Sequence, residues 1–299
     1  EEYALARTER KTAKGYHGFA FHAAPDVTLE QDLARRDLTM NAIAKDADGR
    51  IIDPHGGADD LKAGVLRHVG SAFSEDPVRI LRVARFAARF GFRVAPETMK
   101  LMREMAQNGE ADALVPERVW QELSRGLMEA KPSRMFDVLR ECGALARVMP
   151  EMDALRDDPK AGQAAMRALD AAAQAGATLP VRFAAATRWL VPLAVEALAS
   201  RLKVPADCRD LALLAARHAN TVLDAAELDA DAVLELLGAA DAWRRPERFE
   251  ELVAAVFAGE PGSSPARARL ERARAAAAAV NAGEIAKASK GTADIRGNV

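Results

Sequence analysis

A series of segments that each open with proline most constrains the fold of this 299-residue chain. Within each segment apolar residues recur at three- and four-residue spacing, which is typical of an amphipathic helix, and proline is favoured in the first helical turn. The segments are Pro77–Phe90, Pro96–Gln107, Pro116–Ala130 and Pro132–Cys142. The sequence therefore predicts successive helices after Phe73, and the Ala- and Leu-rich remainder from about Met149 predicts more helices.

Before Phe73 the chain alternates short apolar runs with turn residues, which predicts a mixed α and β region. We expect strands near 3–6, 18–21, 49–54 and 65–69, and helices near 29–44 and 58–63. After Phe73 the strand signals stop. The expected fold class is α+β, with a small mixed region followed by an all-α region.

Composition and charge limit the function classes. The 42 Lys and Arg residues against 44 Asp and Glu residues give a net charge of −2, so nucleic-acid binding must come from local basic faces. No apolar run approaches the ~18 residues of a membrane span. Cys142 and Cys208 form no CxxC pattern, which argues against a zinc site or a disulfide framework. We expect a protein of the reducing cytoplasm.

The helix predicted at 77–90 carries a stripe of arginines. Arg79, Arg82, Arg85, Arg89 and the following Arg93 fall within an arc of about 120° at 100° per residue. Neighbouring like charges cost ~0.2–0.5 kcal/mol per pair, so we expect an anion beside them. The planar guanidinium suits the phosphates of a triphosphate or an RNA backbone. Alternatively, these arginines pair with carboxylates elsewhere in the fold.

Asp76 and Arg79 form a possible base-reading pair at the start of this helix. A carboxylate acceptor beside a guanidinium donor complements the pairing edges of cytosine and adenine, which present an amino donor beside a ring-nitrogen acceptor. Guanine and uracil present the reverse polarity. The alternative is structural, because Asp followed by Pro is also typical of a helix N-cap.

Two further polar clusters lie upstream. Asp37 and Asn41, preceded by Arg36, are spaced one helical turn apart, a pattern that is also common at solvated helix ends. The segment 53–61 reads as a tight turn followed by a helix start, with Asp59 or Asp60 as the capping residue.

Five motifs in a fixed order carry a resemblance to a known family. They are RRDLTMNA, DPHGGADDL, LRHV, EDPVRILRVARFAARF and PERVWQELSRGL. Their order and spacing resemble the bacterial CCA-adding enzymes, which are tRNA nucleotidyltransferases that share ancestry with bacterial poly(A) polymerases. The resemblance is close over residues 1 to about 150. It implies a partial nucleotidyltransferase head at 1–72, a helical neck at 73–133, and a helical, tRNA-binding body and tail at 134–299.

The resemblance also implies a nucleotide-binding site. Three of its arginines would bind the incoming ATP or CTP through phosphates and ribose, two polar residues would shape the pocket, and an Asp–Arg pair would read the base edge. In that order these residues are Arg36, Arg82 and Arg85, then Asp37 and Asn41, then Asp76 and Arg79. The implied partners are tRNA, ATP and CTP.

The catalytic motifs of the family do not occur in this sequence. The family holds its catalytic Mg²⁺ with an Asp-x-Asp motif that follows a Gly-Gly phosphate loop, and we expect both to lie upstream of the segment that corresponds to Glu1. We therefore expect an N-terminally truncated chain without catalytic or metal-binding residues of its own, with Mg²⁺ needed only by the complete enzyme. The Asp46–Asp48 sequence predicts a hairpin turn and the Asp229–Asp231 sequence a helix cap.

Some members of the family also carry a phosphohydrolase domain, whose hallmark is an adjacent His-Asp pair. The position that resembles this motif reads Ala186-Thr187-Arg188-Trp189, and no histidine of the sequence is followed by Asp. We therefore expect no phosphohydrolase activity.

Four functional hypotheses remain at this point. The first is CCA addition to tRNA, and the second is a poly(A) polymerase that accepts ATP alone. The third is a non-catalytic tRNA-binding protein that keeps the pocket without the carboxylates. The fourth, a helical scaffold with an incidental arginine stripe, has to treat the ordered motifs as coincidence. The sequence does not predict an oligomeric state.

Overall fold

The computed structural model describes residues 8–11, 19–22, 27–109, 114–260 and 265–280. Its strands form three two-stranded sheets. β1 (Thr8–Lys11) pairs antiparallel with β2 (Phe19–His22), β3 (Ala44–Lys45) antiparallel with β4 (Ile51–Ile52), and β5 (Val65–Leu66) parallel with β6 (Arg93–Val94). The short helices α1 (Leu29–Ala34) and α2 (Gly57–Ala63) and two 3-10 turns, Thr39–Asn41 and Ser71–Glu75, complete this N-terminal region.

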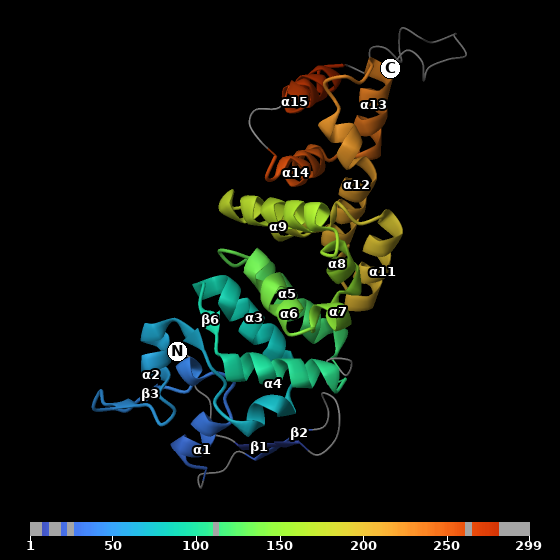
Figure 1. Ribbon diagram of the computed structural model, residues 1–299. Helices are drawn as coiled ribbons and strands as arrows, with labels where there is room; N and C mark the ends of the chain where they lie inside the picture. The colour runs from blue at the N-terminus through green and yellow to red at the C-terminus, as the bar shows by residue number, and fades with distance from the viewer. Residues whose placement is uncertain (1–7, 12–18, 23–26, 110–113, 261–264, 281–299) are drawn as a thin grey trace, which may run out of the picture.

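The remainder is a succession of helices that runs from the N-terminal region to the opposite end of the molecule (Figure 1). They are α3 (Val78–Phe90), α4 (Pro96–Gln107), α5 (Pro116–Leu127), α6 (Ser133–Glu141), α7 (Leu145–Val148), α8 (Pro150–Leu155), α9 (Pro159–Gln174), α10 (Leu179–Thr187), α11 (Pro192–Leu202), α12 (Ala206–Leu223), α13 (Ala230–Ala239), α14 (Pro246–Phe257) and α15 (Pro265–Ala278). The α+β class and the proline-led helices are confirmed. None of the described helices is long and apolar enough to cross a membrane.

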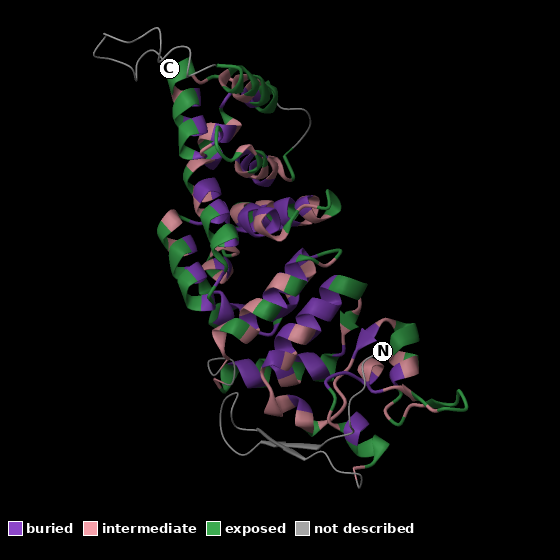
Figure 2. Cartoon of the chain, turned by 180° about the vertical axis from the view of Figure 1, so that it is seen from behind, coloured by how far each residue is buried: buried purple, intermediate pink, exposed green. Residues whose placement is uncertain are grey.

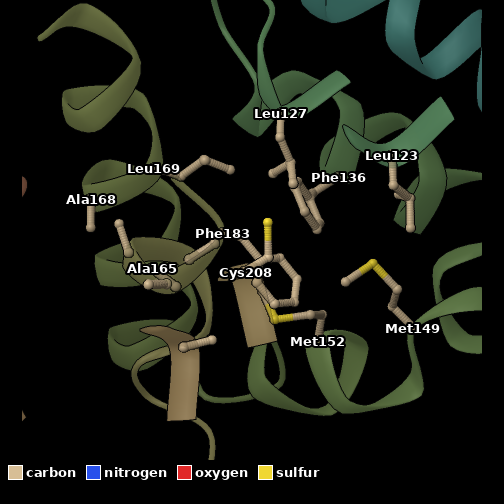
Figure 3. Packing of buried hydrophobic residues seen from close by; sticks show 14 of the residues in the cluster. Leu123, Leu127, Phe136, Met149, Met152, Ala165, Ala168, Leu169, Phe183 and Cys208 are labelled. Carbon is tan, nitrogen blue, oxygen red and sulfur yellow. The ribbon is translucent and has the colours of Figure 1, made fainter. Parts of the chain in front are cut away.

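One apolar core joins the helices. Buried residues line the inner sides of the helices, whereas exposed residues lie on their outer faces (Figure 2). Where the middle helices meet, Leu127 of α5, Phe136 of α6, Leu169 of α9 and Phe183 of α10 come together (Figure 3). Burying a side chain of this size contributes roughly 1.5–3 kcal/mol, so this junction holds α5, α6, α9 and α10 in fixed relation.

The first helix is shorter than the sequence predicts. The helix expected at 29–44 ends at Ala34, because Leu38 is fully buried and bridges to His68. The Thr39 N–H donates to the Arg67 carbonyl in the same region. Residues after Ala34 therefore pair with the segment around His68 instead of continuing the helix.

Among the other expectations, one is wrong and the rest stay predictions. A strand, β6, follows Phe73, and its two residues are too few to show a periodic pattern. The strand expected at 3–6 lies outside the described residues. Glu1, upstream of which we expect the catalytic Asp-x-Asp motif, lies outside them as well, and that expectation stays a prediction. The three-part division of the chain also stays a prediction.

The start of α2 is tied closely to the segment that carries Asp37. The backbone N–H groups of Gly57 and Ala58 donate to Asp53, so Asp53 caps this helix rather than Asp59 or Asp60. A Cβ atom on Gly57 would lie 2.1 Å from the Thr39 carbonyl oxygen, so only glycine permits this approach. The Thr39 hydroxyl also donates to Asp60 at 2.8 Å. These contacts hold the 37–41 segment against α2.

Candidate functional site

A polar cavity of about 510 Å³ lies between the 35–41 segment, the start of α3 and the start of α5. Six of the seven residues predicted for the nucleotide site line it. They are Arg36, Asp37, Asn41, Asp76, Arg79 and Arg82. The structure therefore brings together two motifs that lie about forty residues apart in sequence, and basic side chains outnumber acidic ones around the cavity.

Asp37 lies at the centre of the hydrogen-bond network around the cavity. Its Oδ1 accepts from the Leu38 N–H and from Asn41 Nδ2, both at 2.9 Å, and its Oδ2 accepts from Arg82 Nε at 2.6 Å. Burial opposes ionisation of Asp37, but the Arg82 charge and these hydrogen bonds outweigh it, so the pKa of Asp37 lies below its ordinary value. Asn41 reaches Asp37 from a 3-10 turn, not from the helical turn predicted for the pair.

Arg79 and Arg36 bind main-chain carbonyl groups in this region. Arg79 Nη2 donates to the Arg35 carbonyl at 2.7 Å, which joins α3 to the N-terminal region. Arg36 Nη1 donates to the Asn41 carbonyl at 3.0 Å, while its other nitrogens contact Asp32. The side chain of Arg36 remains 44% exposed, so its guanidinium is reachable from the cavity.

Asp76 makes the structural contact that the sequence left open, and its base-reading role stays a prediction. Its Oδ1 accepts from the Val78 N–H at 3.1 Å, as a helix-capping residue does. The Arg118 guanidinium, at the start of α5, binds both carboxylate oxygens, at 3.2 and 2.7 Å. Because a carboxylate has about four acceptor positions and three of them are occupied, Asp76 retains capacity for one more donor.

The structure does not bring Arg85 to the cavity. At 100° per residue Arg85 is turned away from Arg82 toward α5, where its Nε donates to Glu122 Oε2 at 2.7 Å. Arg82 and Arg85 thus find anions within the chain, in Asp37 and Glu122, which offsets the repulsion expected along the stripe. Arg93 does not continue the stripe, because α3 ends at Phe90 and Arg93 belongs to β6.

Three residues that line the cavity were missed by sequence reasoning: Arg35, Phe86 and Arg118. Arg35 directly precedes Arg36, which was predicted, so its position in the sequence could have indicated it. Arg118 stands within the PERVWQELSRGL motif, but its contact with Asp76 spans 42 residues. The spacing of apolar residues along a helix does not predict a contact between residues so far apart in sequence.

The described residues do not fit a divalent metal. They contain no group of three or more His, Cys, Asp or Glu residues that could hold one, and the cavity's two carboxylates, Asp37 and Asp76, are each bound by an arginine. The two Asp-x-Asp sequences, Asp46–Asp48 and Asp229–Asp231, have the structural roles predicted for them. Asp46 closes the β3–β4 turn by accepting from the Asp48 and Arg50 N–H groups, and Asp229 caps α13.

The position that resembles the phosphohydrolase motif is occupied by structural contacts. The Thr187 hydroxyl donates to the Phe183 carbonyl at 2.8 Å. Arg188 is buried, pairs with Glu260 and stacks over the Trp189 ring at 3.7 Å. A buried arginine at this position adds positive charge where a metal would need negative ligands. The expectation of no phosphohydrolase activity therefore stands as a prediction.

Comparisons with known proteins agree on one family. Residues 2–67 match the family model "Poly A polymerase head domain", and residues 91–156 match "Probable RNA and SrmB-binding site of polymerase A". A multifunctional CCA protein of Chromobacterium violaceum is 56% identical over 321 aligned residues, which cover 96% of this chain and 79% of that protein. The corresponding protein of Laribacter hongkongensis is 54% identical, with coverage of 96% and 80%.

Solved structures share the fold at low sequence identity. A CCA-adding enzyme in apo form II has a TM-score of 0.66 at 20% identity, covering 95% of this chain and 68% of that one. A CCA-adding enzyme in complex with CTP has a TM-score of 0.56 at 21% identity, with coverage of 91% and 64%. A Thermotoga maritima enzyme complexed with tRNA has a TM-score of 0.58 at 20% identity, with coverage of 88% and 64%.

Proposed function

The chain belongs to the family of bacterial multifunctional CCA proteins, and we propose that its cavity beside α3 binds the CTP and ATP from which C, C and A are added to the 3′ end of tRNA. The observation that carries the proposal is the convergence of Arg36, Asp37, Asp76, Arg79 and Arg82 on one cavity. These residues come from two motifs of the family, and the folded chain places them around a single space.

The charge of the cavity suits a nucleoside triphosphate. Arg36 and Arg82 expose 44% and 32% of their side chains, and each is fixed by a carboxylate, Asp32 and Asp37 respectively. Guanidinium groups that are fixed in advance lose little entropy when they bind phosphate oxygens. We therefore assign Arg36 and Arg82 to the phosphates and ribose, and Asp37 and Asn41 to holding Arg82 and the 37–41 segment in place.

Selection of the base is assigned to Asp76 and Arg79. Asp76 supplies an acceptor that Arg118 orients, and Arg79 supplies a donor that the Arg35 carbonyl orients. An acceptor beside a donor matches cytosine and adenine and mismatches guanine and uracil. Protein side chains would then take the place of a nucleic-acid template.

Nucleotidyl transfer in this class of enzymes generally uses a divalent metal, which activates the attacking hydroxyl and carries charge on the leaving pyrophosphate. We propose roles in nucleotide binding and base selection only for the residues named above, since the described carboxylates of the cavity do not fit such a metal. Arg85 is given a structural role.

Calorimetric titration with CTP, ATP, GTP and UTP tests the proposal. We expect CTP and ATP to bind and GTP and UTP to bind at least about fivefold more weakly, because one good pair of base contacts discriminates by about 1–3 kcal/mol. Binding of ATP alone would favour the poly(A) polymerase hypothesis. Equal binding of all four nucleotides, or of none, would contradict the proposed base selection.

A further inference from the structure

One aromatic side chain of the cavity beside α3 has no part in the proposed function so far. Phe86 lines this cavity, yet it is only 8% exposed. It follows Arg82 by one turn of α3, so the two side chains lie on the same face of the helix. A ring with so little exposed surface offers no face on which a nucleobase could stack. The effect of Phe86 on a bound nucleotide must therefore pass through its neighbours.

Two guanidinium groups lie over the ring of Phe86. The Cζ atoms of Arg82 and Arg85 are 5.6 and 4.5 Å from the ring centroid. At distances within about 6 Å, the negative charge on the face of an aromatic ring attracts a cation. Phe90 stacks on Phe86 from the next turn of α3, with centroids 5.9 Å apart and ring planes 12° apart. This stacking holds the ring in place, so the ring can orient the cations above it.

The polar contacts of Arg82 leave its guanidinium one freedom of movement. Its Nε donates to Asp37 Oδ2 at 2.6 Å, whereas its Nη1 is 3.7 Å from Glu122 Oε1, which is too long for a hydrogen bond. One hydrogen bond allows the guanidinium plane to turn about the line from Nε to Asp37. Attraction to the face of Phe86 opposes this rotation. The exposed 32% of the Arg82 side chain then presents its remaining N–H donors in one orientation.

We propose that Phe86 is a positioning residue for the phosphate groups of CTP and ATP, because its ring holds the Arg82 guanidinium in the orientation that binds phosphate oxygens. The inference rests on the proposed function, which assigns Arg82 to the phosphates. Phe86 itself does not touch the nucleotide. Since base selection is assigned to Asp76 and Arg79, the ring should affect all nucleoside triphosphates alike.

The test replaces Phe86 in turn with mono-, di- and trifluorophenylalanine and measures CTP and UTP affinity by calorimetry. Fluorine withdraws negative charge from the ring face and changes the shape of the side chain little. Apparent affinity follows the fraction of molecules in which Arg82 is oriented for binding. We expect both affinities to fall stepwise along the series, by about two- to fivefold in total, at a constant ratio of CTP to UTP affinity. A role of Phe86 in packing alone would give no such steps.

Two controls isolate the contact between Phe86 and Arg82. The same series at Phe90 changes a ring that is 41% exposed, carries the Arg89 guanidinium at 5.2 Å and lies outside the cavity lining. It should leave nucleotide affinity unchanged. In an Arg82→Gln background the series at Phe86 should have no further effect, because the cation that the ring orients is gone. Urea denaturation establishes that each variant is folded.

The outcomes separate this inference from the proposed function. Unchanged CTP affinity in folded fluorinated variants of Phe86 would overturn the inference and leave the proposed function intact. A changed ratio of CTP to UTP affinity would place Phe86 at the base and overturn it as well. A stepwise loss that persists in the Arg82→Gln background would show that the ring does not act through Arg82. Failure of the wild type to bind any nucleotide would contradict the proposed function itself.

Discussion

Replacing Arg85 with methionine is expected to lower the free energy of unfolding by about 3 kcal/mol, measured by urea denaturation near pH 7. The side chains of Arg85 and Glu122 are only 9% and 5% exposed, and they form a direct ion pair at 2.7 Å. Removing one partner of a buried pair costs about 3–5 kcal/mol because the other charge is left in a poor solvent. The lower end applies here, since Arg82 and Arg125 remain 3.7 Å from Glu122.

Two further variants isolate the buried charge as the cause. Arg89→Met lies on the same helix at an exposed position, so its effect should stay within about 0.5 kcal/mol. The double variant Arg85→Met/Glu122→Met should recover most of the lost stability, because apolar residues of similar volume often replace a buried pair without loss. A stability of Arg85→Met equal to that of the wild type would contradict the structural role given to Arg85.

The second large effect concerns Arg82, which faces the cavity and binds Asp37. Arg82→Gln should lower the free energy of unfolding near pH 7 by about 2–4 kcal/mol, because Asp37 is left buried and without its cation. The figure is below that of a fully buried pair, since the Arg82 side chain is 32% exposed. Urea denaturation measures this difference, and CTP affinity should fall in the same variant.

The pH dependence of that effect has a definite sign. In the wild type the folded-state pKa of Asp37 lies below the ordinary value of 3.8, so its contribution is present above that value and is lost as the pH falls through the folded pKa. Without Arg82, the largest cause that lowers the pKa of Asp37 is lost, so we expect burial to raise that pKa. The stability gap between wild type and variant should therefore narrow as the pH falls from about 7 to about 4. A gap that widens over this range would contradict the ion-pair account.

The helices and the composition of the cavity were largely predictable from the sequence. Apolar spacing and leading prolines located α4 at Pro96–Gln107 and α3 to within one residue. Both are local signals. The motif order also placed six of the seven expected residues in one space, because the family resemblance carries tertiary information that periodicity lacks.

What could not be predicted depends on long-range contacts. Arg82 and Arg85 lie within the same arc of the stripe. Arg82 faces the cavity because it pairs with Asp37, whereas Arg85 is buried because it pairs with Glu122 on α5. The helix expected at 29–44 is cut short by the burial of Leu38 and its bridge to His68. Neither partner is visible from the local sequence.

The measurement that tests the central claim most directly is the ratio of CTP to UTP affinity in the wild type and in Asp76→Asn. Asparagine keeps the oxygen that caps α3 but replaces Oδ2, which accepts from Arg118 and holds the remaining acceptor position, with an amide donor. Our account predicts a wild-type ratio of at least about five that falls toward one in the variant, while the phosphate contacts sustain some binding of both nucleotides. An unchanged ratio in a folded Asp76→Asn variant would show that Asp76 does not read the base.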